Sequence, residues 1–331
     1  MPDMRYDVIG VGNAIVDVLS PAEESFLSDH GLDKGVMTLI DGARGTELYD
    51  AMGPAVEVSG GSAANTLAGI ASLGGRGAYI GKVRADVLGE VFRHDIRAIG
   101  VDYRTMPAEG AGEPTARCLI FVTPDAERTM QTCLGVSVEL GPADIDVEAI
   151  QAAQITYLEG YLFDPPEAKK AFVHAAEAAH AAGRKVALSL SDAFCVDRHR
   201  AEFLHLISGH IDILFANEDE ITSLFEVDSF DRALEMTRGH CEIAALTRSA
   251  KGSVILNHDQ AHEVPAAAVG KVVDSTGAGD LYAAGVLYGL TKGFELPECA
   301  RIGGLAAAEV IQHYGARPEM SLAKLLADSK A

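Results

Sequence analysis

The stretch from Asp274 to Asp280 (DSTGAGD) has the residue types and the spacing for phosphate chemistry. Residues 277–279 stand just before an apolar run, Leu281 to Leu290, whose lack of a polar face predicts a buried helix. A glycine-rich approach to a helix N-terminus leaves backbone N–H groups free, and these groups and the helix dipole attract anions. Asp280 stands in the first turn, where it could accept the proton of a hydroxyl group brought to that place.

The same stretch also fits a structural role. Glycines are common in turns, and an aspartate at the start of a helix often accepts hydrogen bonds from free backbone N–H groups. In that interpretation Asp280 caps the helix and takes no part in chemistry. A carboxylate at a helix N-terminus is moreover expected to have a lowered pKa and to be a weak base.

Two other stretches carry groups suited to a nucleotide. Asn217 and Glu220 begin a predicted helix after a predicted strand at 211–216, and an amide and a carboxylate one turn apart could hold hydrated Mg²⁺ against phosphates. They could equally form a helix cap with a first-turn acid. Residues 247–252 (TRSAKG) place a hydroxyl and two cations at another strand end, although Lys251 fits an ordinary turn with a solvated charge.

The second half of the chain alternates predicted strands and helices, which indicates a parallel sheet with helices on both faces. The strands are expected at 155–159, 185–190, 211–216 and 242–248, and the helices near 165–182, 197–208 and 217–239, the last broken near Val227. The predicted fold class is α/β, a doubly wound and mostly parallel sheet. Ligands of such sheets bind beyond the C-terminal ends of the strands, where the 274–280 motif would open.

The strands predicted in the first 133 residues do not all follow this alternation of strand and helix. Residues of about 13–59 and 115–133 predict a small discontinuous β-sheet that projects over the binding edge as a lid, within a single domain that spans residues 1–331. Gly60 and Gly61 precede a helix that runs to Leu73, with Ser62 as the expected N-cap. The paired glycines are expected to act as the hinge of the lid.

Composition excludes several classes of function. The net charge of −21 and the lack of a basic stripe argue against nucleic acid as a partner. No run approaches the ~20 apolar residues of a membrane span, and the first apolar stretch lacks a basic leader. Five cysteines without metal spacing favour a reducing, cytoplasmic location. Gly10 and Gly12 lack the third small residue of a dinucleotide fingerprint, since Ile15 stands there.

Together the motifs resemble the PfkB family of carbohydrate kinases, also called the ribokinase family. Residues 60–65 (GGSAAN) resemble its N-terminal signature and residues 274–280 its C-terminal signature, and the resemblance covers nearly the whole chain. It implies a ribokinase-like fold and transfer of the γ-phosphoryl group of MgATP to a substrate hydroxyl.

The resemblance also implies roles for single residues. Asp280 is the expected base, and the developing phosphate charge is held by Gly277, Ala278 and Gly279. The substrate positions are Asn13, Asp17, Gly60, Gly61 and Asn65. The ATP positions are Asn217, Glu220, Thr247, Gly252 and Thr276, with Glu220 as the metal ligand. The expected cofactors are ATP and Mg²⁺, and a monovalent cation such as K⁺ is a further candidate. Ser249 departs from the family, which usually has glycine there.

The sequence favours one class of substrate but does not identify the substrate itself. Residues 12–17 and 188–194 resemble adenosine kinases, which favours a nucleoside, adenosine first. Apolar side chains that could enclose a purine, or simply pack the lid on the domain, are Met37, Leu39, Cys118, Ile120 and Phe163. A sugar kinase acting on ribose or a related sugar is the alternative, and a regulator that binds such ligands without catalysis is a third hypothesis. A homodimer through the lid is expected, because few strands leave open edges.

Overall fold

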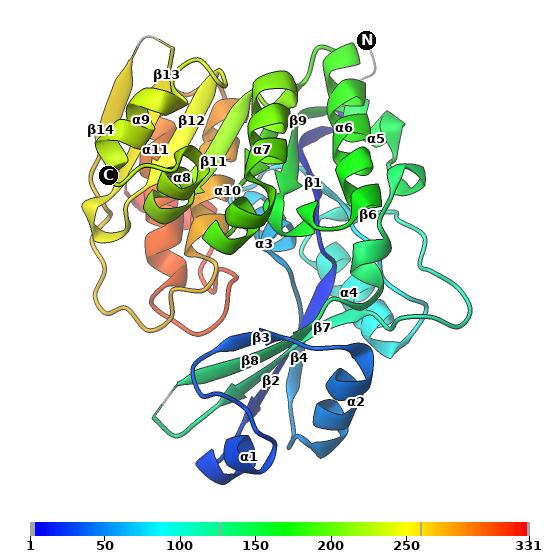
Figure 1. Ribbon diagram of the computed structural model, residues 1–331. Helices are drawn as coiled ribbons and strands as arrows, with labels where there is room; N and C mark the ends of the chain where they lie inside the picture. The colour runs from blue at the N-terminus through cyan, green and yellow to red at the C-terminus, as the bar shows by residue number, and fades with distance from the viewer. Residues whose placement is uncertain (1–3, 126, 259, 330–331) are drawn as a thin grey trace.

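The structure, a computed structural model, describes residues 4–125, 127–258 and 260–329. It has two parts (Figure 1): a larger one, in which a nine-stranded sheet lies between helices, and a smaller five-stranded sheet below it. The strands of both sheets alternate along the chain, so the polypeptide passes between the two parts more than once.

The larger sheet has the order β14-β13-β12-β11-β10-β9-β1-β5-β6, and its strand pairs are parallel except β12 with β13 and β13 with β14, which are antiparallel. Its strands are β1 (Tyr6–Val11), β5 (Gly77–Ile80), β6 (Asp102–Tyr103), β9 (Ala153–Glu159), β10 (Lys185–Ser189), β11 (Ile213–Asn217), β12 (Ile243–Thr247), β13 (Ser253–Asn257) and β14 (Ala261–Val264). The central strands are buried on both faces, which explains their nearly continuous apolar sequences.

Helices cover both faces because alternate residues of each strand point to opposite sides; Val8 and Ile9 thus enter different cores. One core includes α3 (Ser62–Ser72), α4 (Val87–Ala98), α10 (Ala278–Thr291), α11 (Leu296–Val310) and α12 (Leu322–Asp328). The other includes α5 (Val147–Gln151), α6 (Pro166–Ala181), α7 (Ala193–His210), α8 (Glu218–Phe225) and α9 (Phe230–Thr237).

The smaller sheet has the order β3-β8-β7-β2-β4. Its strands are β2 (Ile15–Pro21), β3 (Met37–Leu39), β4 (Val56–Gly60), β7 (Ala116–Val122) and β8 (Arg128–Cys133). One face buries Val16 and Val18 with residues of α1 (Glu24–Asp29) and α2 (Gly42–Ala51). The opposite face carries Asp17 and stays partly exposed, with Leu39 57% and Val58 37% accessible.

The predicted fold class is confirmed: an α/β fold with a mostly parallel sheet and a small second sheet. The predicted break near Val227 is confirmed by the interval between α8 and α9. Two short helices, α1 and α2, were not predicted; Asp41 precedes α2, and its side chain caps the helix by accepting from the Arg44 N–H. No helix within the described ranges is both long and apolar enough to cross a membrane.

Candidate active site

The turn before α10 presents free backbone donors. Gly277 is the N-cap residue and has a φ of 80°, a left-handed conformation that glycine adopts without strain. A Cβ atom there would lie 2.7 Å from the Cα of Ala316. Among the described residues, no acceptor contacts the N–H groups of Gly277, Gly279 or Asp280, whereas the N–H of Ala278 donates to the Ser275 carbonyl. The predicted anion-binding turn therefore offers donors at three positions.

Asp280 is held by two side chains of α3. Its Oδ1 accepts from the Ser62 hydroxyl at 2.6 Å, and its Oδ2 accepts from the Asn65 Nδ2 at 3.0 Å. The two helices approach closely because Gly69 has no side chain: a Cβ atom there would lie 2.6 Å from the Cβ of Ala284. The two signature stretches, which are more than 200 residues apart, are thereby joined at one carboxylate.

Three sequence-based interpretations of the starts of α10 and α3 are wrong. Asp280 does not cap α10, since Gly277 is the N-cap and its helix has no side-chain cap, and Ser62 does not cap α3, because its hydroxyl serves Asp280. The pKa of Asp280 is not lowered. Burial raises it to about 6, against the lowering effect of the hydrogen bonds from Ser62 and Asn65. Asp280 is therefore ionised at neutral pH and is a better proton acceptor than an ordinary aspartate.

Asp17 lies in the middle of the open face of the smaller sheet and faces the same space. None of the described residues donates a hydrogen bond to its carboxylate. Burial raises the pKa of Asp17 to about 6; Arg317 and Arg128 oppose that shift, and the charge of Asp280 adds to it. The negative charges of Asp17 and Asp280 thus repel each other across the junction of the two sheets.

Gly60 and Gly61 make room for this arrangement. A Cβ atom on Gly60 would lie 2.4 Å from the Asp17 Oδ2. Gly61 has a φ of 95°, and a Cβ atom there would lie 2.3 Å from the carbonyl oxygen of Asn13. Both glycines of the motif are therefore required by close contacts in the folded chain.

We expect Gly61→Ala to lower the free energy of unfolding by at least about 2 kcal/mol, because positive φ and a backbone clash both oppose a side chain. Urea unfolding measures this loss. Gly304→Ala is the matched control: it lies inside α11 with open space around its Cβ position, so it should leave stability unchanged or raise it by up to about 1 kcal/mol. Equal stabilities of the two variants would contradict the assignment.

Glu159 is a buried carboxylate that sequence reasoning missed. It ends β9, and its oxygens accept from the backbone N–H of Ala63 and from the backbone and side-chain N–H groups of Asn13. Burial raises its pKa to about 7, with a further contribution from Asp280. Asn13 is itself buried and its Oδ1 accepts from the Ser137 hydroxyl, so this predicted substrate residue lies beneath the site and holds Glu159. Gly12 leaves space for that carboxylate.

The predicted nucleotide residues come together at neighbouring strand ends. Asn217 and Thr247 are paired in register at the C-terminal ends of β11 and β12. Asn217 and Glu220 form a reciprocal capping box at the start of α8, so the capping interpretation describes their contacts in this structure. Burial raises the pKa of Glu220 to about 7. The φ of Gly252 is 88°, and a Cβ atom there would lie 2.1 Å from the Val264 carbonyl oxygen.

The turn after β12 has Ser249 in a backbone conformation that favours glycine. This serine adopts a φ of 49°, the left-handed conformation that glycine would adopt without strain. Arg248 does not point freely toward a ligand, since its guanidinium pairs with Glu218 and stacks 4.0 Å from the centroid of the Phe230 ring. Within the described parts of the chain, no three His, Cys, Asp or Glu side chains form a ready metal site. A magnesium ion bound mainly through nucleotide phosphates needs only one or two protein carboxylates, which Glu220 can supply.

The pKa of Tyr161, just beyond the C-terminal end of β9, responds to four carboxylates. Burial raises the pKa of the Tyr161 hydroxyl, and the carboxylates of Asp192, Asp280, Glu220 and Glu159 raise it further. All four carboxylates therefore lie near enough to Tyr161 to act on its hydroxyl, at the C-terminal edge of the sheet.

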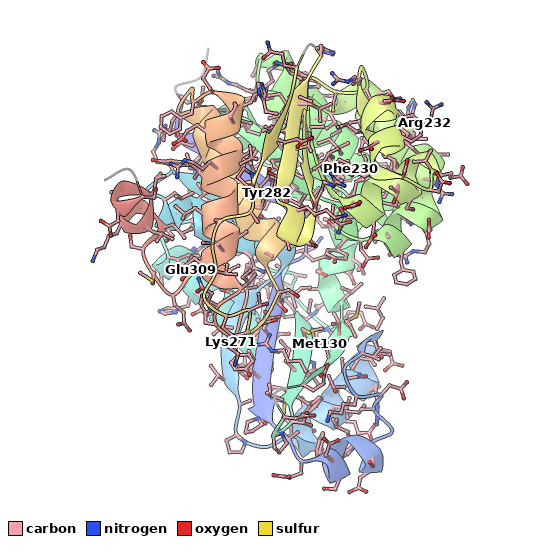
Figure 2. The ribbon with its side chains drawn as sticks, turned by 90° about the vertical axis from the view of Figure 1, so that its left-hand side faces the viewer. Met130, Phe230, Arg232, Lys271, Tyr282 and Glu309 are labelled. Atoms are coloured by element: carbon pink, nitrogen blue, oxygen red, sulfur yellow. The ribbon has the colours of Figure 1, made fainter. Side chains whose placement is uncertain are left out.

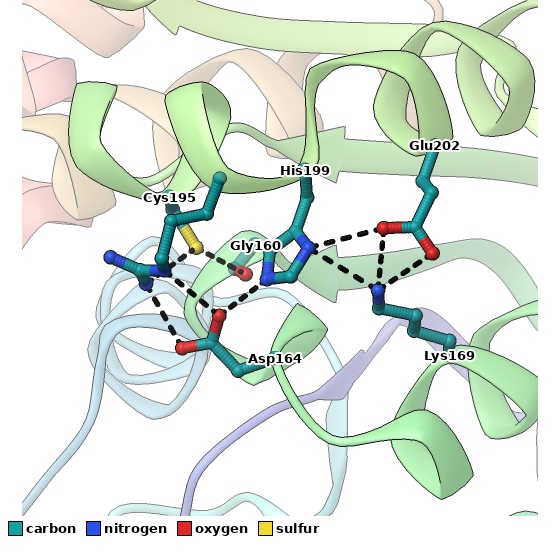
Figure 3. Close-up of polar contacts among 7 residues, drawn as sticks. Gly160, Asp164, Lys169, Cys195, His199 and Glu202 are labelled. Carbon is teal, nitrogen blue, oxygen red and sulfur yellow. Dashed lines mark hydrogen bonds and ion pairs between the residues drawn. The ribbon is translucent and has the colours of Figure 1, made fainter.

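The segment that carries Tyr161, η3 (Gly160–Phe163), is fixed to α7 by the charged cluster in Figure 3. Asp164 pairs with Arg198 and His199, and Lys169 pairs with Glu202 on the next turn. Phe194, in the first turn of α7, is 75% exposed. The cluster thus holds the segments that carry Tyr161 and Phe194 against each other.

An ion pair joins the two parts of the molecule. Arg128, at the start of β8, contacts the Asp274 carboxylate at 2.6 Å, and both side chains are at least nine-tenths buried. Asp274 also accepts from the N–H and hydroxyl of Thr276, which shapes the turn before α10. In Figure 2, Met130 and Lys271 lie at the level where the smaller sheet meets the loop that precedes this turn. The sequence did not indicate a role for Arg128 at the site, because an arginine in a predicted hairpin is compatible with an ordinary exposed position.

The apolar candidates for enclosing a base divide into two groups. Met37 and Leu39 are about half exposed, and Cys118 and Ile120 are buried in the register that places them beside Asp17 and Leu19. Phe163 was predicted wrongly: it is 3% exposed and packs against Phe172 and Phe203 in the core of the larger part.

Comparison with known proteins agrees with these features. Residues 46–322 match the pfkB family of carbohydrate kinases. A solved structure named as adenosine kinase from Sinorhizobium meliloti is 53% identical over 99% of this chain and all of that one, with a TM-score of 0.90. A probable sugar kinase from Rhizobium etli is 51% identical over 99% of both chains, with a TM-score of 0.91.

A nucleoside kinase from Methanocaldococcus jannaschii is 28% identical over 79% of this chain and 82% of its own length. The match to the family extends over most of the chain and includes both signature stretches that meet at Asp280. The predicted resemblance is confirmed: this chain belongs to the pfkB family of carbohydrate kinases.

Proposed function

We propose that this protein transfers the γ-phosphoryl group of ATP to a hydroxyl group of a nucleoside, with adenosine as the first candidate. The observation that carries the proposal is the pair of carboxylates that face one space, Asp280 beside the free N–H groups of α10 and Asp17 without a protein partner. The names of the relatives from S. meliloti and M. jannaschii support a nucleoside as the acceptor.

Each carboxylate suits a different task. Asp280 accepts the proton of the attacking hydroxyl, and the N–H groups of Gly277 and Gly279 stabilise charge on the transferring phosphoryl group. Asp17 accepts hydrogen bonds from two neighbouring hydroxyls of a ribose. A magnesium ion, when bound, would neutralise charge on the nucleotide phosphates, with Glu220 as its candidate protein ligand.

The surroundings of Asp17 favour a nucleoside over a free sugar. Apolar side chains flank it on the open face of the smaller sheet, and Tyr161 and Phe194, which are 42% and 75% exposed, are candidates for contacting the base from the larger part. These groups match the faces of a purine better than sugar hydroxyls. We further propose that the segments 13–59 and 115–133 act as a lid, with Arg128 contacting Asp274 when the lid is closed.

An assay of ADP formation with a panel of nucleosides and sugars tests the proposal. We expect kcat/KM for adenosine to exceed that for ribose by roughly a hundredfold, because about 100 Å² of apolar contact at ~25 cal/mol per Å² would be lost with the base. Preference for ribose would support the sugar kinase suggested by the name of the R. etli relative. Tight nucleoside binding without ADP formation would instead support a non-catalytic regulator.

A further inference from the structure

Arg317 lies between α11 and α12, and its guanidinium group is buried next to the site. Nη1 donates to the Ser59 Oγ at 2.7 Å, and Nε donates to the Asn65 Oδ1 at 3.4 Å. The buried Nη2 has no hydrogen-bond partner in the described part of the chain. Burial of a guanidinium is unfavourable unless neighbouring groups use its donors and its charge, so these contacts indicate a role.

Asn65 connects Arg317 with Asp280. Its Nδ2 donates to the Asp280 Oδ2 at 3.0 Å, while its Oδ1 faces the guanidinium. A flipped amide would place its oxygen against a carboxylate and its NH₂ group against a cation. The two charged neighbours therefore permit one orientation of the amide, in which the N–H points at Asp280.

The segment that carries Arg317 is fixed from two sides. Glu309, near the end of α11 (Figure 2), accepts from the backbone N–H groups of residues 319 and 320 at 3.0 and 2.9 Å. The Gly315 N–H donates to the Asp274 carboxylate at 3.1 Å, so the segment packs on the turn that leads into α10. Arg317 is thus presented to Asn65 by backbone that already contacts the anion-binding turn.

We propose that Arg317 is a positioning residue for phosphoryl transfer, which holds the Asn65 amide so that its N–H stabilises the ionised Asp280 carboxylate. The inference rests on the proposed function, because it takes Asp280 as the base. In this assignment Arg317 itself touches neither substrate nor nucleotide; it acts through Asn65.

Acidic groups surround Asp280, so the effect of Arg317 on this base can be measured as a shift of the pKa of Asp280. Asp280 raises the pKa values of Asp17 on β2, of Glu159 and Tyr157 on β9, and of Tyr161 on η3, so all four groups lie within its electrostatic reach. Within this acidic surrounding, each hydrogen bond donated to Asp280 favours its ionised form. Loss of the Asn65 donor should therefore raise the pKa of Asp280 and move the acid limb of the kcat–pH profile to higher pH.

The test compares Arg317→Met with the wild type over pH 5–9. We expect the acid limb of kcat to move up by about one pH unit, with activity partly recovered at alkaline pH. Ser59→Ala is the matched control, since it removes the other hydrogen bond of Arg317 and should leave the limb in place. If the methionine variant does not fold, Arg317→Lys takes its place. Lysine keeps the positive charge but lacks the planar fork that contacts both Ser59 and Asn65. A smaller shift of the acid limb in the same direction is then expected.

A double-mutant cycle separates positioning from charge. If Arg317 acts through Asn65, adding Arg317→Met to Asn65→Ala should shift the limb no further. An equal shift in both backgrounds, or a lowered melting temperature with an unchanged limb, would overturn the assignment. NMR titration of the Asp280 carboxyl carbon in wild type and Arg317→Met gives the same comparison without turnover. A shifted Asp280 titration in a chain that phosphorylates nothing would therefore reject the kinase proposal, and would keep only the conclusion that Arg317 orients the Asn65 amide toward Asp280.

Discussion

Replacing Asp280 by asparagine is expected to lower kcat by at least about 10²–10⁴-fold, the usual contribution of a general base. Asparagine has the same shape but cannot take the proton of the attacking hydroxyl. The Asn65 amide can still donate to the single amide oxygen, and the Ser62 hydroxyl, which lies at the other position, can accept from the new NH₂ group. The fold should therefore survive, since Gly277, and not Asp280, is the N-cap of α10.

The measurement is kcat of the folded variant beside its melting temperature, with ATP affinity as a control that should change little. The wild type should also lose activity as pH falls through about 6, because protonation of Asp280 at its raised pKa removes the base. The residual activity of Asp280→Asn should lack that acid limb. Turnover near the wild-type level would reject Asp280 as the base and restore a structural role.

The second large effect is expected from Asp17→Ala, which should reduce kcat/KM for a ribonucleoside by about 2–4 kcal/mol, or roughly 30- to 800-fold. Asp17 has no protein donor in the described structure, so bound hydroxyl groups would lose their only acceptor there. The variant should fold normally, because removing a half-buried carboxylate with a raised pKa relieves an unfavourable burial.

The 2′-deoxyribonucleoside is the control substrate for Asp17. It offers one hydroxyl fewer, so its loss on mutation should be clearly smaller than that of the ribonucleoside. Equal losses for the two substrates would show that Asp17 does not read the 2′-hydroxyl. Asp17→Asn keeps the shape and one acceptor oxygen, and should fall between the wild type and the alanine variant for the ribonucleoside.

The sequence predicted the larger sheet well because buried parallel strands have a distinctive pattern. The strands near 155–159 and 211–216 are nearly continuous apolar runs separated by helix-length segments, and β9 and β11 occupy them. The short α1 and α2 were not predicted, because 6 and 10 residues give too few turns for a clear apolar period. Their burial depends on contacts with the smaller sheet.

The candidate site was predictable only where a motif fixes the backbone. The 274–280 turn showed its glycines and its aspartate, but not the pKa of Asp280, which depends on burial beneath a second sheet. Glu159 gave no signal, since one glutamate after an apolar strand is compatible with any strand end. Phe163 was misplaced because sequence cannot tell a ring facing the site from one packed among Phe172 and Phe203.

The contacts at Asp280 also affect how the chain acquires its site during folding. The hydrogen bonds that join Ser62 and Asn65 to Asp280 span 218 and 215 residues, and the bond from Arg317 to Ser59 spans 258. Contacts so distant in the chain form only after large loops have closed, a step opposed by chain entropy. The individual helices and strands can therefore be present before the base is oriented, and ligand binding should be among the last native properties to appear on refolding.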